Sequence, residues 1–157
     1  MTINDTWAYN ANDRKYKSAT QLIRTLIEVA SKGGNLLLNV GPTPEGTIQP
    51  EFEERLLEIG RWLEVNGESI YGTTYGPVQD LAFGKMTAKG KNLYMHVFDW
   101  PKDGRILLAG IPGRVAAARL LRGGGRVRFT QAGDRLTLEV PASAPDPHAS
   151  VVAISLQ

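Results

Sequence analysis

The hydrophobic pattern changes twice along this chain. Apolar residues recur at helical spacing over residues 19–32 and 51–66, and residues 36–40 between them are apolar apart from Asn39. Beyond residue 76 the period falls to two, as in strands with one buried face. The pattern predicts two helices around one buried strand, followed by a region of short strands.

Residues 33–42 are the most informative stretch. Apolar side chains at Leu36, Leu37, Leu38 and Val40 lie on both faces of the predicted strand, which is the pattern of a strand covered on each side in doubly wound sheets and barrels. A lone α-β-α unit would leave both edges of that strand unpaired in water. We therefore expect these residues to end a larger parallel sheet, and the chain to be part of something longer.

Both helices have start signals. Ser18 and Gln21 form a capping box before the first helix, and Pro50 suits the first turn of the second. Arg24 and Glu28 are expected to form a surface pair. The buried faces are expected to contain Leu22, Ile23, Leu26, Ile27 and Ala30 in the first helix, and Phe52, Leu56, Ile59 and Leu63 in the second.

Short runs of alternating polarity, separated by glycine-containing turns, continue to the end of the chain. We predict strands at residues 93–98, 105–109, 126–130, 135–140 and 150–156. The close spacing of these runs favours hairpins and therefore antiparallel pairing. The second region is expected to be a small antiparallel β-sandwich.

The charge distribution divides the chain at the same place. The formal net charge is +2, but residues 1–76 contain 7 Lys or Arg against 10 Asp or Glu, whereas residues 77–157 contain 11 against 6. This shift supports two domains with these bounds. A basic second half could suggest nucleic acid. Its arginines follow alternating strands without a ladder of aromatic residues to stack bases, so we interpret them as a solvated sheet face and expect no nucleic-acid partner.

Composition excludes several kinds of site. The sequence contains no cysteine, which rules out disulfides and thiolate chemistry. No apolar run approaches the roughly 18 residues that span a bilayer, so no membrane partner is expected. His96 and His148 are the only histidines, and no spacing of His, Asp and Glu resembles a ligand set. We expect neither a metal nor a cofactor.

Several short segments of the first half recur, in this order and spacing, in a known family. They are Trp7-Ala8-Tyr9-Asn10, Tyr16-Lys17-Ser18, residues 31–42, Gly46-Thr47-Ile48, Pro50-Glu51-Phe52, Arg55-Leu56, residues 59–63, Asn66-Gly67-Glu68 and residues 70–73. In these segments the chain resembles the α-L-fucosidases of glycoside hydrolase family 29. The resemblance is specific over residues 1–76, and residues 77–157 are similar in general character to the short β-rich C-terminal domain of that family.

The resemblance implies a fold and a reaction. The fold class would be α/β plus all-β, with the last β/α unit of a TIM-like (β/α) barrel followed by a small antiparallel β-sandwich. The reaction would be retaining hydrolysis of terminal α-L-fucosyl linkages, with fucosylated glycans or oligosaccharides as partners. The family's aspartate nucleophile and glutamate acid/base would both precede Met1. The chain would then contain no catalytic residue and would be inactive alone.

Two residues are candidates for contact with the sugar. Barrels place their chemistry on loops after the carboxyl ends of strands, where Trp7 and Asn39 occur. By the resemblance, Trp7 would lie against the apolar face of fucose, including its methyl group, or else be a core residue at the barrel rim. Asn39 could touch the substrate or orient a loop. Glu45, Asp5 and Asp13 are interpreted as turn formers or caps rather than as catalytic acids.

Two alternatives stay open. The chain could be a stand-alone carbohydrate-binding protein with Trp100, Tyr75 and Tyr94 as a platform, although this leaves the apolar strand and the helices unexplained. Residues 77–157 could instead form a purely structural β-sandwich that closes the barrel. No signal peptide is visible in the chain. A secreted or periplasmic location of the parent enzyme therefore stays open, as does the oligomeric state.

Overall fold

Both predicted helices form at the expected positions. The computed structural model describes residues 1–79 and 81–157. Within it, helix α1 is Ala19–Ser31 and helix α2 is Pro50–Asn66. The Ser18 hydroxyl accepts a hydrogen bond from the Gln21 amide at 3.1 Å, as expected of a capping box. A 3-10 turn, η1 (Gly67–Ser69), follows α2 directly.

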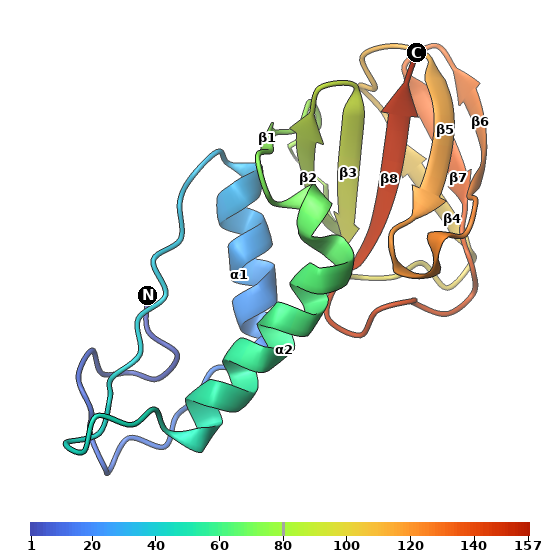
Figure 1. Cartoon of the computed structure of the whole chain (residues 1–157). Helices are drawn as coiled ribbons and strands as arrows, with labels where there is room; N and C mark the ends of the chain where they lie inside the picture. Colours follow the sequence, from blue (N-terminus) through green and yellow to red (C-terminus); the bar gives the residue numbers. More distant parts are fainter. Residues whose placement is uncertain (80) are drawn as a thin grey trace.

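Two antiparallel sheets form most of the second half (Figure 1). The first sheet has the strand order β1-β2-β3-β8-β5 and the second the order β4-β7-β6. The elements are β1 (Thr74–Tyr75), β2 (Gly84–Lys89), β3 (Asn92–Val97), β4 (Arg105–Leu108), β5 (Val115–Leu120), η2 (Arg122–Gly124), β6 (Arg128–Ala132), β7 (Arg135–Glu139) and β8 (Ser150–Leu156). The polarity pattern does not predict β1, β2 and β5, because glycine and alanine weaken the alternation of polarity in the two longer strands.

The chain is arranged in three layers, with the helix pair on one side of the five-stranded sheet and the three-stranded sheet on the other (Figure 1). Strands β3 and β8 lie in the middle layer and are buried on both faces. Met95 and Val152 face the core between the sheets, whereas Tyr94 and Ala153 face the helices. The helices therefore cover a sheet made by the second half of the chain, which the sequence analysis did not predict.

The predicted strand at residues 36–40 is wrong as a strand of this chain. Of these residues only Asn39 pairs, in an isolated parallel bridge with Thr2. The Asn39 amide donates to the Met1 carbonyl at 2.9 Å, and the Met1 amino group donates to the Leu37 carbonyl at 2.7 Å. A strand needs ladder partners along its length, and residues 1–2 supply only one short edge. No barrel-type sheet forms in the described part of the chain, although the pairing direction is parallel.

The predicted pair between Arg24 and Glu28 on α1 is also wrong. The Arg24 guanidinium donates to the carbonyls of Phe98 at 2.8 Å and His148 at 3.0 Å. Glu28 instead accepts from the Lys32 ammonium at 2.7 Å. The polar pattern of this helix face predicts a surface position for Arg24, but its guanidinium lies against backbone of the β region.

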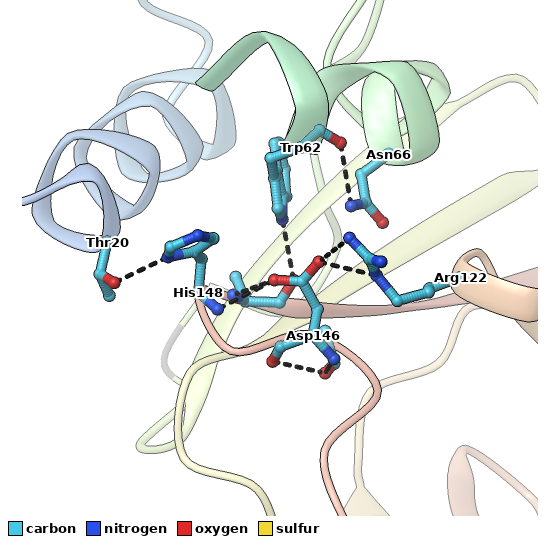
Figure 2. A network of polar contacts seen from close by, with 8 residues as sticks. Thr20, Trp62, Asn66, Arg122, Asp146 and His148 are labelled. Atoms are coloured by element: carbon cyan, nitrogen blue, oxygen red, sulfur yellow. Dashed lines mark hydrogen bonds and ion pairs between the residues drawn. The ribbon is translucent and has the colours of Figure 1, made fainter. Parts of the chain in front are cut away.

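Trp62 anchors α2 to the middle sheet. Periodicity placed Leu56 in the buried stripe of this helix, but Leu56 is 40% exposed and Trp62 is 1% exposed. The Trp62 indole N–H donates to the Ala149 carbonyl at 3.0 Å, and its ring centroid lies 6.3 Å from that of His96. Trp62 therefore packs beside β3 and joins α2 to the loop before β8 (Figure 2).

A buried carboxylate, Asp146, holds the loop before β8 (Figure 2). Its Oδ2 accepts from the Arg122 guanidinium at 3.0 Å and 2.8 Å, and its Oδ1 accepts from the His148 amide at 2.9 Å. The His148 ring in turn lies 2.8 Å from the Thr20 hydroxyl of α1. Because this loop contacts α1 here and α2 through Trp62, it fixes the helix pair against the sheets.

Candidate functional site

The structure brings the two predicted sugar-contact residues together. The Asn39 side-chain amide donates to the backbone carbonyl of Trp7 at 2.7 Å. This bond fits the loop-orienting alternative for Asn39. The Trp7 side chain is 63% exposed, so it is not a core residue among the residues of this chain.

Gly41 lies directly against the loop that carries Trp7, which we call the N-terminal loop (residues 4–15). A Cβ atom on Gly41 would lie 2.6 Å from the Tyr9 amide nitrogen and 2.7 Å from the Ala8 carbonyl carbon. These distances are shorter than real Cβ contacts, and the opposing atoms belong to the backbone. The absence of a side chain at Gly41 therefore lets the N-terminal loop pack against the segment that follows Asn39.

We expect Gly41→Ala to displace the N-terminal loop and to lower the free energy of unfolding by about 1 to 3 kcal/mol, because backbone atoms cannot move aside as a flexible side chain does. Urea denaturation of the purified chain measures this loss. Gly60→Ala is the matched control, since nothing lies within 4 Å of its Cβ position and alanine is favoured over glycine in a helix interior. Equal stability of the two variants would contradict the expectation.

Asp13 stabilises the N-terminal loop by accepting hydrogen bonds from other residues of the same loop. Its Oδ2 accepts from the amides of Asp5 and Thr6 at 3.0 Å and from the Thr6 hydroxyl at 3.1 Å, and its Oδ1 accepts from the Lys15 amide at 3.1 Å. Burial raises the pKa of Asp13, but the hydrogen bonds from Lys15, Thr6 and Asp5 outweigh burial, and the net pKa is lowered.

The interpretation of Asp13 as a turn former is confirmed by its bond to the Lys15 amide two residues ahead. Sequence reasoning missed its second role, which is to hold the residues immediately before Trp7. Those contacts span seven and eight residues, so no local turn motif signals them. The only available signal was the residue type, because aspartate often accepts from backbone amides in loops.

Glu45 lies in a turn, as predicted. The Gly46 amide donates to the Thr43 carbonyl at 2.9 Å, and the Thr43 amide donates to the Thr47 carbonyl at 2.9 Å. Gly46 has a φ of 80°, a conformation that glycine adopts without steric cost. The Glu45 side chain is exposed, and the bonds within this turn explain the local sequence without a catalytic role.

The aromatic platform of the alternative binding protein is wrong because Tyr94 is buried. Tyr94 is 4% exposed and packs in the same core cluster as Trp62. Trp100 donates its indole N–H to the Pro141 carbonyl at 2.8 Å, and Tyr75 lies on strand β1. These three aromatic residues cannot form one exposed surface.

His96 is buried in β3 beneath the helices. The Thr87 hydroxyl donates its one proton to the Ser69 carbonyl at 2.7 Å, so in the 3.2 Å contact between Thr87 and His96 the donor must be Nε2–H of the ring. The other ring nitrogen, Nδ1, has no hydrogen-bond partner among the described residues. Burial lowers the pKa of His96 to about 3, which makes this ring neutral at pH 7.

Neither a metal cluster nor a membrane span occurs in residues 1–79 and 81–157. No group of three His, Asp or Glu side chains in these ranges could hold a metal ion. None of the helices in these ranges is long and apolar enough to cross a bilayer.

The described architecture defines a class of protein. It is a small antiparallel β domain covered by two helices, with an N-terminal loop whose Trp7 backbone is bound by Asn39. Known proteins share this architecture. The α-L-fucosidase family model matches residues 1–68. The α-L-fucosidase of Branchiostoma floridae is 41% identical over 118 residues, which are 71% of this chain and 26% of that protein.

Solved structures extend the match to the β domain. α-L-Fucosidase isoenzyme 1 from Paenibacillus thiaminolyticus is 39% identical, with a TM-score of 0.92, and the match covers 100% of this chain and 39% of that one. The Thermotoga maritima α-fucosidase in complex with fucose is 32% identical, with a TM-score of 0.83, over 98% of this chain and 38% of that one. The chain belongs to the α-L-fucosidase family, glycoside hydrolase family 29. It spans about a quarter of the length of the curated relatives that it matches.

Proposed function

We propose that this chain is the C-terminal part of a retaining α-L-fucosidase that hydrolyses terminal α-L-fucosyl linkages of glycans. In this proposal residues 1–76 are the last β/α unit of the catalytic (β/α) barrel and residues 77–157 are the accessory β-sandwich. The change of charge near residue 76 supports this boundary, and the first strand of the sheets, β1, lies immediately before it.

The observation that carries the proposal is the parallel pairing of residues 1–2 with residues 37–39. Two parallel segments end at the same edge, and Trp7 and Asn39 occur at or just after these ends. Barrel enzymes place their chemistry on the loops at the carboxyl ends of parallel strands. The hydrogen bond between Asn39 and Trp7 supports one shared site at that edge.

In this site Trp7 would contact the apolar face of a fucosyl residue, and Asn39 would orient the loop that carries Trp7. A retaining glycosidase needs two carboxyl groups about 5 Å apart. Asp13 is occupied by donors of its own loop, and Glu45 lies in an exposed turn. We therefore assign neither a nucleophile nor an acid/base to this chain and propose that the rest of the enzyme supplies both.

A chimeric enzyme tests this proposal. The chain replaces the corresponding 39% of the Paenibacillus thiaminolyticus isoenzyme, and hydrolysis of an aryl α-L-fucoside is measured. We expect an active chimera in which Trp7→Ala raises KM about three- to tenfold, because an aromatic stacking contact contributes about 0.5 to 1.5 kcal/mol.

The control is Tyr75→Ala, which removes another aromatic side chain that is 64% exposed but lies on β1. This variant should leave KM unchanged. A folded but inactive chimera would contradict the assignment to a fucosidase. Unchanged kinetics in Trp7→Ala would show that Trp7 has a structural role and does not contact the sugar.

A further inference from the structure

The backbone around Trp7 is held by several contacts, whereas the Trp7 side chain is 63% exposed. The Asn39 amide binds the Trp7 carbonyl at 2.7 Å, and Gly41 packs against the backbone of residues 8–9. Asp13 binds the two amides that precede Trp7. An exposed aromatic side chain on a fixed backbone is preorganised for binding, because little ordering is left to occur when a ligand arrives.

The contact from Asp13 is the one that involves a charge. The amides of Asp5 and Thr6 both point at Oδ2, each at 3.0 Å. Successive backbone N–H groups that converge on one point form a concavity for an anion, and a charged acceptor binds such donors more strongly than a neutral one. Asp13 is 9% exposed, so water has little access to the position of its carboxylate.

Other contacts anchor the start of the N-terminal loop independently of Asp13. The Lys17 ammonium donates to the Asn4 carbonyl at 3.0 Å, and the Lys17 amide donates to the Ile3 carbonyl at 2.8 Å. Ile3 is fully buried and packs with Phe52 of α2. Loss of the Asp13 carboxylate should therefore free residues 5–7 while the helices and sheets stay folded.

We propose that Asp13 is a positioning residue for the sugar contact of Trp7. It fixes the backbone amides of residues 5 and 6 and thereby the orientation of the Trp7 side chain relative to the loop. Asp13 acts through the loop, since both of its oxygens accept from donors of the loop itself. This role rests on the proposed function for the identity of the ligand, a fucosyl residue. The fixing of the loop is independent of that function.

Nuclear magnetic resonance of the complete 157-residue chain tests the fixing of the loop. Asp13→Asn is compared with Asp5→Asn, a matched control in the same loop whose exposed side chain lies 3.9 Å from the Lys15 ammonium. We expect Asp13→Asn to speed hydrogen exchange at the amides of Asp5 and Thr6 about tenfold or more and to lower the order parameter of the Trp7 indole. The control should change neither quantity.

Unchanged exchange and indole order in a folded Asp13→Asn chain would overturn the proposal. Should this variant fail to fold, Asp13→Glu serves instead, because it keeps the charge and moves the oxygens by one methylene group. The same increase in exchange is expected for it, and the same lack of change would overturn the role.

Kinetics of the chimeric fucosidase separate positioning from general destabilisation. Asp13→Asn should raise KM for the aryl fucoside about three- to tenfold with kcat nearly unchanged, and should have no further effect when Trp7 is already alanine. Additive effects of the two substitutions would overturn the positioning role. If Trp7→Ala alone leaves KM unchanged, the proposed function fails, and the exchange measurement still decides the role of Asp13.

Discussion

Lowering the pH from 6.5 to 5 should reduce the free energy of unfolding of this chain, and His96→Gln should remove most of that dependence. The folded-state pKa of His96 is lowered from 6.5 to about 3 by burial. Between these values the unfolded chain binds a proton that the folded chain does not, so stability falls as the pH falls. Well above pH 6.5 both states are neutral at this residue and the effect vanishes.

The expected size follows from one proton. The limiting slope is about 1.4 kcal/mol per pH unit, which gives a loss of roughly 1 to 2 kcal/mol between pH 6.5 and 5 and of several kcal/mol by pH 3.5. The carboxyl groups of Asp13 and Glu28 have lowered pKa values, so their stabilisation is lost only at more acidic pH. The interval from 6.5 to 5 therefore separates the contribution of His96 from those of Asp13 and Glu28.

Urea denaturation at several pH values measures this slope. His148→Gln, at a partly buried position, is the control for loss of a histidine, and the slopes of both variants are compared with that of the wild type. Gln at position 96 keeps an amide N–H that could donate to Thr87, whereas it has no group that titrates in this interval. Equal slopes for wild type and His96→Gln would show that the ring is protonated in the folded chain.

Trp62→Ala should destabilise the chain strongly, by about 3 to 5 kcal/mol. The Trp62 side chain fills the core between α1, α2 and the middle sheet, where it shares a cluster with Ile23 and Val151. Its removal would leave a cavity in that core. It would also leave the Ala149 carbonyl without the indole N–H, which now donates to it at 3.0 Å.

Trp62→Phe separates the hydrogen bond from the packing. This variant keeps an aromatic ring and should cost about 1 to 3 kcal/mol, since the buried Ala149 carbonyl loses a donor. Trp100→Phe removes a similar bond, from the Trp100 indole to the Pro141 carbonyl at 2.8 Å, at a site that is only partly buried. Chemical denaturation of both variants gives the comparison, and a smaller loss for Trp62→Phe than for Trp100→Phe would contradict the anchoring role of Trp62.

Contacts between the helices and the loop before β8 hold α1 and α2 in place, although only a short parallel pairing forms at the start of the chain. Arg24 and Trp62 both bind backbone carbonyls of the loop before β8, and Asp146 holds that loop. A buried carboxylate is stabilising only when its partners satisfy it, and Arg122 and the loop amides do so. The β domain thus supports the helix pair from which the N-terminal loop extends.

The sequence by itself determined the local elements and the family. Both helices, five of the strands, the Ser18 cap and the turn around Glu45 follow from patterns within a few residues, because periodicity, capping and turn chemistry act over short distances. The motifs between Trp7 and Thr73 indicated the α-L-fucosidase family for the same reason, since they are runs of adjacent residues.

The tertiary structure alone decided which faces are buried and what the loops hold. Leu56 is expected to be buried but is exposed, and Tyr94 is a candidate for an exposed platform but is buried. Both differences arise because α2 turns Trp62 toward a sheet that is distant in sequence. Residues 36–40 are apolar apart from Asn39, but they form no strand here, because a strand depends on hydrogen-bond partners that its own sequence does not contain. Asp13, Gly41 and Asn39 act on the backbone around Trp7 through contacts that no periodicity encodes.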